Sequence, residues 1–140
     1  MTKDEELAKY LSIIEQYKEQ MNSLEMQSQY LQAAIADYSK AKMTIDQLSK
    51  TDKGDEILLP IGGSSFINAT TNDPSKVLFD IGAGVVTEKN SEDAIKKIDK
   101  RIEDLEKTQE RLVGIMQNLQ NEAAEISAKA QAILSEGKKE

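Results

Sequence analysis

The stretch from Val77 to Asn90, VLFDIGAGVVTEKN, decides between two kinds of fold. A Gly-Ala-Gly at residues 82–84 separates two short apolar runs and stands shortly before a long helical pattern. Such glycines occur in phosphate-binding loops and also in the turns of β-hairpins. A phosphate-binding loop needs a following Gly-Lys-Ser/Thr or a third glycine three residues on, where this chain has Thr87. We therefore interpret the glycines as a hairpin turn.

The segment around this stretch, residues 51–90, reads as four short strands. The runs EILLPI, SSFINATT, KVLFDI and VVTEK are rich in β-branched and aromatic residues, and GGSS, TNDPS and GAG separate them with turn residues. The pattern predicts two β-hairpins. Pro60 cannot donate a ladder hydrogen bond, so we expect it at a strand end or an edge.

Both flanks of this segment carry heptad repeats, which are typical of coiled coils. The N-terminal seam is apolar except at Ser28 and Lys42, and comprises Leu7, Tyr10, Ile14, Tyr17, Met21, Leu24, Ser28, Leu31, Ile35, Tyr38, Lys42 and Ile45. The C-terminal seam is apolar except at Gln109, and comprises Ile95, Ile98, Ile102, Leu105, Gln109, Leu112, Met116, Leu119, Ala123, Ile126, Ala130 and Ile133.

The two seams have equal length, which favours an antiparallel helical hairpin within one chain. Leu7 then lies near Ile133, and Ile45 lies near Ile95. Parallel homodimers of each helix are the alternative. Lys42 and Gln109 have two interpretations, since polar seam residues can set register or partner choice, or can simply be tolerated on a partly open seam.

Composition excludes several functional classes. A formal net charge of -7 in 140 residues disfavours a nucleic-acid-binding protein. The absence of His and Cys rules out imidazole or thiolate metal sites and their nucleophilic chemistry. Asp73 and Asp80 read as a turn residue and a strand residue rather than as a catalytic pair. We expect no enzyme, cofactor, metal or membrane span, and a cytoplasmic location.

The predicted strands carry apolar side chains on both faces, more than a one-sided two-stranded sheet can cover. We therefore expect other subunits to cover them. The candidate oligomerisation residues are Leu58, Phe66, Ile67, Val77, Phe79, Ile81, Val85 and Val86.

The predicted order of a helix, four strands and a helix resembles the alpha-class subunit of archaeal prefoldin over essentially the whole chain. The most specific parts of the resemblance are LLPIGGSSFI (Leu58–Ile67) and VLFDIGAGVVTEKNSEDAI (Val77–Ile95). One departure is Ser64, where the family often has Gly. The resemblance implies a mostly helical α+β fold with an N-terminal helix (3–50), two oligomerising hairpins (51–90) and a C-terminal helix (91–136). It also implies a hexamer of two alpha and four beta subunits, built on a β-barrel platform.

The same resemblance implies an ATP-independent holdase that captures unfolded polypeptides at its coiled-coil tips and passes them to a group II chaperonin. The tips fall at the chain ends, where the candidate client-binding residues are Leu7, Tyr10, Leu11, Ile14, Ile126, Ala130, Ile133 and Leu134. The alternative is a structural coiled-coil spacer or filament subunit that binds no clients.

Overall fold

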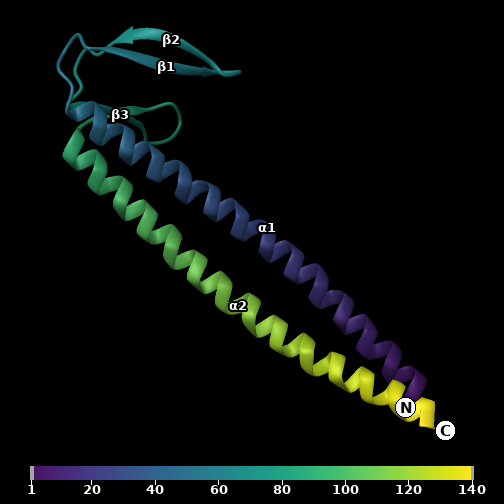
Figure 1. Cartoon of the computed structure of the whole chain (residues 1–140). Coiled ribbons are helices and arrows are strands. Elements are labelled where there is room, and N and C mark those ends of the chain that lie inside the picture. The colour runs from purple at the N-terminus through teal and green to yellow at the C-terminus, as the bar shows by residue number, and fades with distance from the viewer. Residues whose placement is uncertain (1, 140) are drawn as a thin grey trace. The chain divides into compact units, whose positions relative to one another are not determined.

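The computed structural model describes residues 2–139 and contains, within them, two long helices joined by two β-hairpins (Figure 1). The elements in chain order are α1 (Lys3–Ser49), β1 (Glu56–Gly62), β2 (Ser65–Thr70), β3 (Lys76–Asp80), β4 (Val86–Asn90) and α2 (Ser91–Lys139). The expected α+β, mostly helical fold is confirmed.

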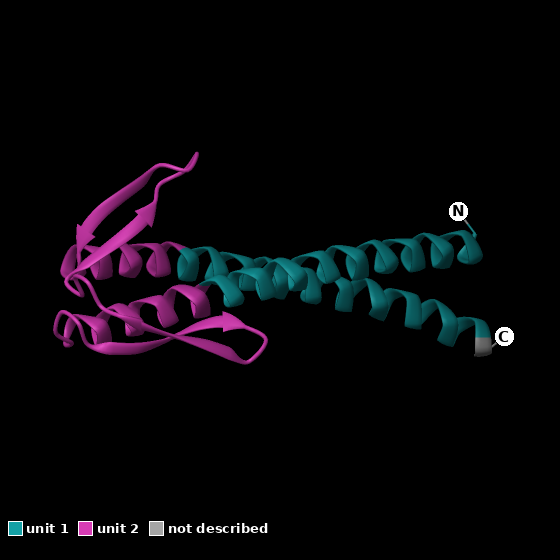
Figure 2. Cartoon of the chain, turned by 90° about the horizontal axis from the view of Figure 1, so that it is seen from above, with its two compact units in different colours: residues 1–34, 105–140 teal, residues 35–104 magenta. Residues whose placement is uncertain are grey.

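The chain divides into two compact units, which Figure 2 shows in different colours. The helical unit comprises the helical segments up to Ala34 and from Leu105 onward. The hairpin unit comprises residues 35–104, and so holds the end of α1, both hairpins and the start of α2.

In the helical unit the two segments run antiparallel. Lys3 Nζ lies 3.3 Å from Glu136 Oε2, and Gln109 Nε2 donates a 2.6 Å hydrogen bond to Ser28 Oγ. These pairs agree within a few residues with the predicted alignment of Leu7 with Ile133. Every predicted seam position of both segments is buried or half-buried. The heptad pattern therefore identified the face along which the helices pack.

In the hairpin unit, a small core joins the helices to the second hairpin. Ile45 from α1 packs with Ala94 and Ile98 from α2, and Val77 and Phe79 of β3 pack against this cluster. The side chain of Asn90 accepts a 2.8 Å hydrogen bond from the Asp93 backbone N–H and so caps α2. The strand-to-helix junction is held in addition by the Ser91 N–H, which donates to the Ser75 carbonyl over 2.8 Å.

The strands form two separate two-stranded antiparallel sheets. In the first, Glu56 pairs with Thr70 and Pro60 with Phe66, and the ladder becomes irregular between Pro60 and Gly62. Each strand of a two-stranded sheet is an edge strand, so Pro60 stands where a missing N–H is tolerated. In the second sheet the register runs from Lys76 opposite Asn90 to Asp80 opposite Val86.

The Gly-Ala-Gly at residues 82–84 forms the turn of the second hairpin, as predicted. The Val85 N–H donates to the Gly82 carbonyl and the Ile81 N–H donates to the Val85 carbonyl, over 3.0 and 2.9 Å. All three turn residues have positive φ, including Ala83 at 52°. Ile81 and Val85 were expected in strands and lie in the turn instead, because the strand ladder ends at the pair of Asp80 and Val86.

The turn of the first hairpin places Gly63 and Ser64 both at a φ of 58°. Two central residues with positive φ are typical of a type I′ hairpin turn, which favours Gly and Asn. Serine has no such preference, since its Cβ crowds the backbone in the left-handed region.

Replacing Ser64 with Gly is therefore expected to stabilise the first hairpin by about 0.5–1 kcal/mol, the steric relief being partly offset by the greater freedom of glycine in the unfolded chain. Hydrogen exchange of the β1 and β2 amides measures the effect as a rise in protection. Ser65→Gly is the matched control: Ser65 lies in β2 without positive φ, so the same substitution is expected to lower protection. Equal or lower protection in Ser64→Gly contradicts the strain argument.

Candidate functional site

The two chain ends meet at one end of the helical unit. The Thr2 hydroxyl accepts a 3.2 Å hydrogen bond from the Glu5 N–H at the start of α1, and the ion pair of Lys3 with Glu136 brings the end of α2 beside it (Figure 1). A groove of about 440 Å³ opens there, lined by Thr2, Lys3, Asp4, Leu7, Ile133, Leu134 and Gly137. The antiparallel helices thus bring residues from both ends of the sequence into one surface feature.

The eight candidate tip residues differ in how far they are exposed. Leu11 and Leu134, which lie one position off the seam, keep 53% and 46% of their surface open. Ala130 is buried, and the other five, Leu7, Tyr10, Ile14, Ile126 and Ile133, are half-buried along the seam. Leu7, Ile133 and Leu134 share the end groove, whereas Ile14 lines a neighbouring one. Leu11 and Leu134 are therefore the tip side chains most accessible to another molecule.

This neighbouring groove was not expected from the sequence. It has a volume of about 360 Å³ and is lined by Ile14, Tyr17, Lys18, Met21, Leu119, Gln120, Ala123, Ala124 and Ser127. The sequence could have indicated this groove, because Ala123 occupies a seam position and most other seam residues have larger side chains. Desolvation, a hydrogen bond to Glu122 and the negative charges of Glu122 and Glu125 raise the pKa of Tyr17 at its wall.

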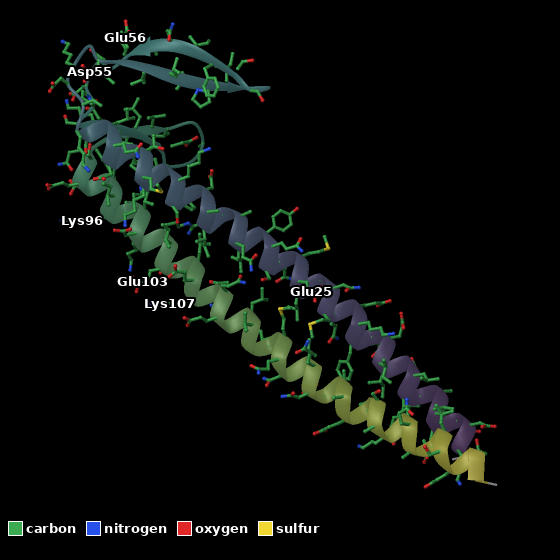
Figure 3. The ribbon with its side chains drawn as sticks, in the orientation of Figure 1. Glu25, Asp55, Glu56, Lys96, Glu103 and Lys107 are labelled. Carbon is green, nitrogen blue, oxygen red and sulfur yellow. The ribbon has the colours of Figure 1, made fainter. Side chains whose placement is uncertain are left out.

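The first hairpin exposes apolar side chains on both faces. Leu58 and Phe66 lie on one face of this hairpin and are exposed. Phe66 pairs with Pro60, and Pro60 is two residues from Leu58, so all three point to the same face of the sheet. Leu59 pairs with Ile67 on the opposite face, and both are also exposed. The predicted oligomerisation residues did not include Leu59 and Ile61, although the alternation in EILLPI places both on this opposite face. Asp55 and Glu56 lie where this hairpin joins the loop after α1 (Figure 3).

The second hairpin uses one face within its own chain. Val77 and Phe79 are half-buried against the core of the hairpin unit, and Lys97 Nζ lies 5.2 Å from the centre of the Phe79 ring. Leu78 points to the other face and is 69% exposed, although the prediction had passed over it. The remaining candidates, Ile81, Val85 and Val86, are exposed. Val77 and Phe79 thus differ from the other oligomerisation candidates, because their own chain already covers much of them.

The carboxylates between the strands have structural partners. Asp73 accepts hydrogen bonds from the Ser75 N–H and hydroxyl, over 3.1 and 2.6 Å, and these bonds lower the pKa of Asp73. Asp80 accepts a 2.9 Å bond from the Gly82 N–H inside the turn. Within residues 2–139 no cluster of three or more acidic, His or Cys side chains is arranged to hold a metal ion. In the same range no helix is both long and apolar enough to cross a membrane.

Two antiparallel helices joined by two small hairpins, with apolar surface at the hairpins and at the chain ends, define a coiled-coil assembly subunit. The chain matches the family described as "Prefoldin subunit" over residues 17–136 and belongs to it. It is thus a chaperone-type subunit that assembles with other prefoldin subunits, in a family of chaperones rather than enzymes.

Two relatives named "Prefoldin subunit alpha" illustrate the similarity. "Prefoldin subunit alpha" of Methanococcus maripaludis strain C5 is 32% identical over 107 residues, which cover 76% of this chain and 72% of the relative. The protein of the same name from Methanosarcina mazei is 30% identical over 132 residues, covering 87% of this chain and 93% of the relative. These relatives are alpha-class, in agreement with the resemblance seen in the two hairpin stretches.

Two solved structures share the fold. A chain of filamentous PFD from Methanocaldococcus jannaschii superimposes with a TM-score of 0.59 at 23% identity, covering 89% of this chain and 98% of that chain. The prefoldin beta subunit from Thermococcus strain KS-1 gives a TM-score of 0.59 at 17% identity, with 90% of each chain covered.

Proposed function

We propose that this subunit is part of an ATP-independent holdase that captures unfolded polypeptides at its tips and delivers them to a group II chaperonin in the cytoplasm. The observation that supports client binding is the open apolar surface at the chain ends, where Leu11 and Leu134 stand exposed near the groove that contains Leu7 and Ile133. An unfolded chain exposes apolar side chains that such a surface can cover.

Several weak tips acting together explain holding without a single tight site. In the proposed hexamer of two alpha and four beta subunits, each tip contributes a small apolar area, and the linkage of the tips raises the overall affinity. Helix ends also open more readily than helix centres, which lets the same side chains adapt to clients of different shape. Release then requires no nucleotide chemistry.

The test is aggregation of an unfolded model protein, followed by light scattering, with the complex assembled from this chain and a beta-class subunit. Leu11→Ser combined with Leu134→Ser is expected to lower the apparent client affinity of the complex by about tenfold, from the lost apolar area of two side chains. Suppression is expected to be independent of ATP.

The matched control is Val113→Ser combined with Ile115→Ser, since both are exposed apolar residues of the helical unit away from the chain ends. This variant is expected to suppress aggregation like the unmodified complex, and all complexes are expected to keep the same mass in multi-angle light scattering. Unchanged holding by the tip variant would show that the tips do not bind clients.

The second candidate function is a structural subunit of a filament that binds no clients. The open edges of both two-stranded sheets support it, because an uncovered edge can pair with further copies. A fold similar to that of a filamentous relative is compatible with this view. Light scattering and electron microscopy of the chain, alone and with a beta-class subunit, separate the two: a closed heteromeric hexamer supports the holdase, and open-ended growth supports the filament.

A further inference from the structure

We infer that Ser28 and Gln109 act as a specificity-determining pair that selects the alignment of α1 against α2. They are two of the three polar positions in the two seams, and they lie 81 residues apart in sequence. In the structure they meet, with Gln109 Nε2 donating to Ser28 Oγ over 2.6 Å. Both side chains are half-buried between the helices.

Stability alone does not explain this pair. The second polar atom of the amide, Gln109 Oε1, is buried and has no hydrogen-bond partner among the described residues. A buried acceptor without a partner destabilises the folded state, whereas two apolar side chains of similar size would bury surface without that penalty. Polar residues at single seam positions are known to specify register at a cost in stability. The pair fits that role.

The pair distinguishes the observed alignment from alignments in which one helix is shifted by seven residues. Apolar seam residues repeat every seven positions, so the rest of the seam still packs after such a shift. Ser28, however, then lies opposite Ile102 or Met116, and Gln109 lies opposite Met21 or Ile35. Both polar groups lose their partner in either direction. The hydrogen bond therefore exists only in the observed alignment.

The third polar seam residue does not make this distinction. Lys42 Nζ lies 2.6 Å from Asp99 Oδ1 in the hairpin unit. The residues one heptad before and after Asp99 are Glu92 and Glu106, so Lys42 finds a carboxylate in all three alignments. Lys42 instead disfavours a parallel pair of α1 helices, where it would face its own copy. Of the three polar seam residues, Ser28 and Gln109 are therefore the ones that distinguish the observed register from its neighbours.

The experiment measures the alignment in the full-length chain. The protein has no cysteine, so Ser23→Cys and Gln117→Cys allow spin labels to be attached at two exposed positions of the helical unit away from the chain ends. Dilution with unlabelled chain restricts the measured distances to one molecule. The unmodified seam is expected to give one narrow distance distribution. Ser28→Leu combined with Gln109→Leu is expected to add at least one population in which the helices are displaced by about 10 Å, the rise of seven helical residues.

Two controls accompany this variant. Met21→Leu combined with Met116→Leu also changes two half-buried seam positions but keeps the polar pair, and is expected to retain the single distribution. Ser28→Thr keeps the hydroxyl group and is expected to do the same. If circular dichroism shows that the double-leucine chain does not fold, Ser28→Ala combined with Gln109→Met replaces it. A single, unshifted distribution in the folded apolar variant would overturn the inference.

Discussion

Replacing Leu58 and Phe66 with serine is expected to abolish assembly with other prefoldin subunits while the chain itself stays folded. Both side chains lie on one face of the first hairpin and are exposed, so their own chain gains little from them. Burying an exposed Leu or Phe side chain contributes about 1.5–3 kcal/mol. The two substitutions together should then weaken association by about a thousandfold.

Multi-angle light scattering with a beta-class subunit measures the loss as a fall in mass, and circular dichroism checks the helices. Met26→Ser combined with Tyr30→Ser is the matched control, because these residues are also exposed and apolar but lie on α1 in the helical unit. The control complex is expected to keep its full mass. If the hairpin variant still formed a full-size complex, the first hairpin would not be part of the assembly interface.

Replacing Ile98 with alanine is expected to lower the free energy of unfolding by about 2–4 kcal/mol, the range for large-to-small changes in a packed core. Ile98 is only 2% exposed and packs with Ile45 and Ala94, where β3 rests on the helices. The cavity left behind should also loosen Val77 and Phe79, so protection of the β3 amides from hydrogen exchange should fall as well.

Ile115→Ala provides the comparison for this change, since Ile115 is on the same helix but 45% exposed. It is expected to cost less than about 1 kcal/mol, because little apolar surface is withdrawn from contact. Denaturant unfolding followed by circular dichroism measures both variants. Similar losses in the two would mean that the core of the hairpin unit does not carry the stability assigned to it.

Which candidate side chains at the chain ends and hairpins are exposed could be predicted in part from the sequence, because heptads and alternation report which side chains share a face. Leu11 and Leu134 were among the predicted client-binding residues, and both are exposed. Leu59, Ile61 and Leu78 were missed, although the same alternation places them on open faces. The groove beside Tyr17 and Ala123 was missed for a different reason, since the space between two helices depends on the sizes of side chains from both.

The sequence by itself determined the seam and the hairpin turn at residues 82–84. Each depends on residues that are near neighbours along the chain. There, backbone geometry makes side chains return to the same face about every 3.5 residues in a coiled coil and every two residues in a strand.

Only the tertiary structure decided that Val77 and Phe79 dock on their own helices while the first hairpin keeps both faces open. It also decided that Gln109 meets Ser28. The two hairpins look alike in composition, and a heptad repeat packs almost equally well after a shift of seven residues. Which faces meet is therefore settled by contacts between segments distant in sequence, through turn geometry and the pairing of a few polar side chains.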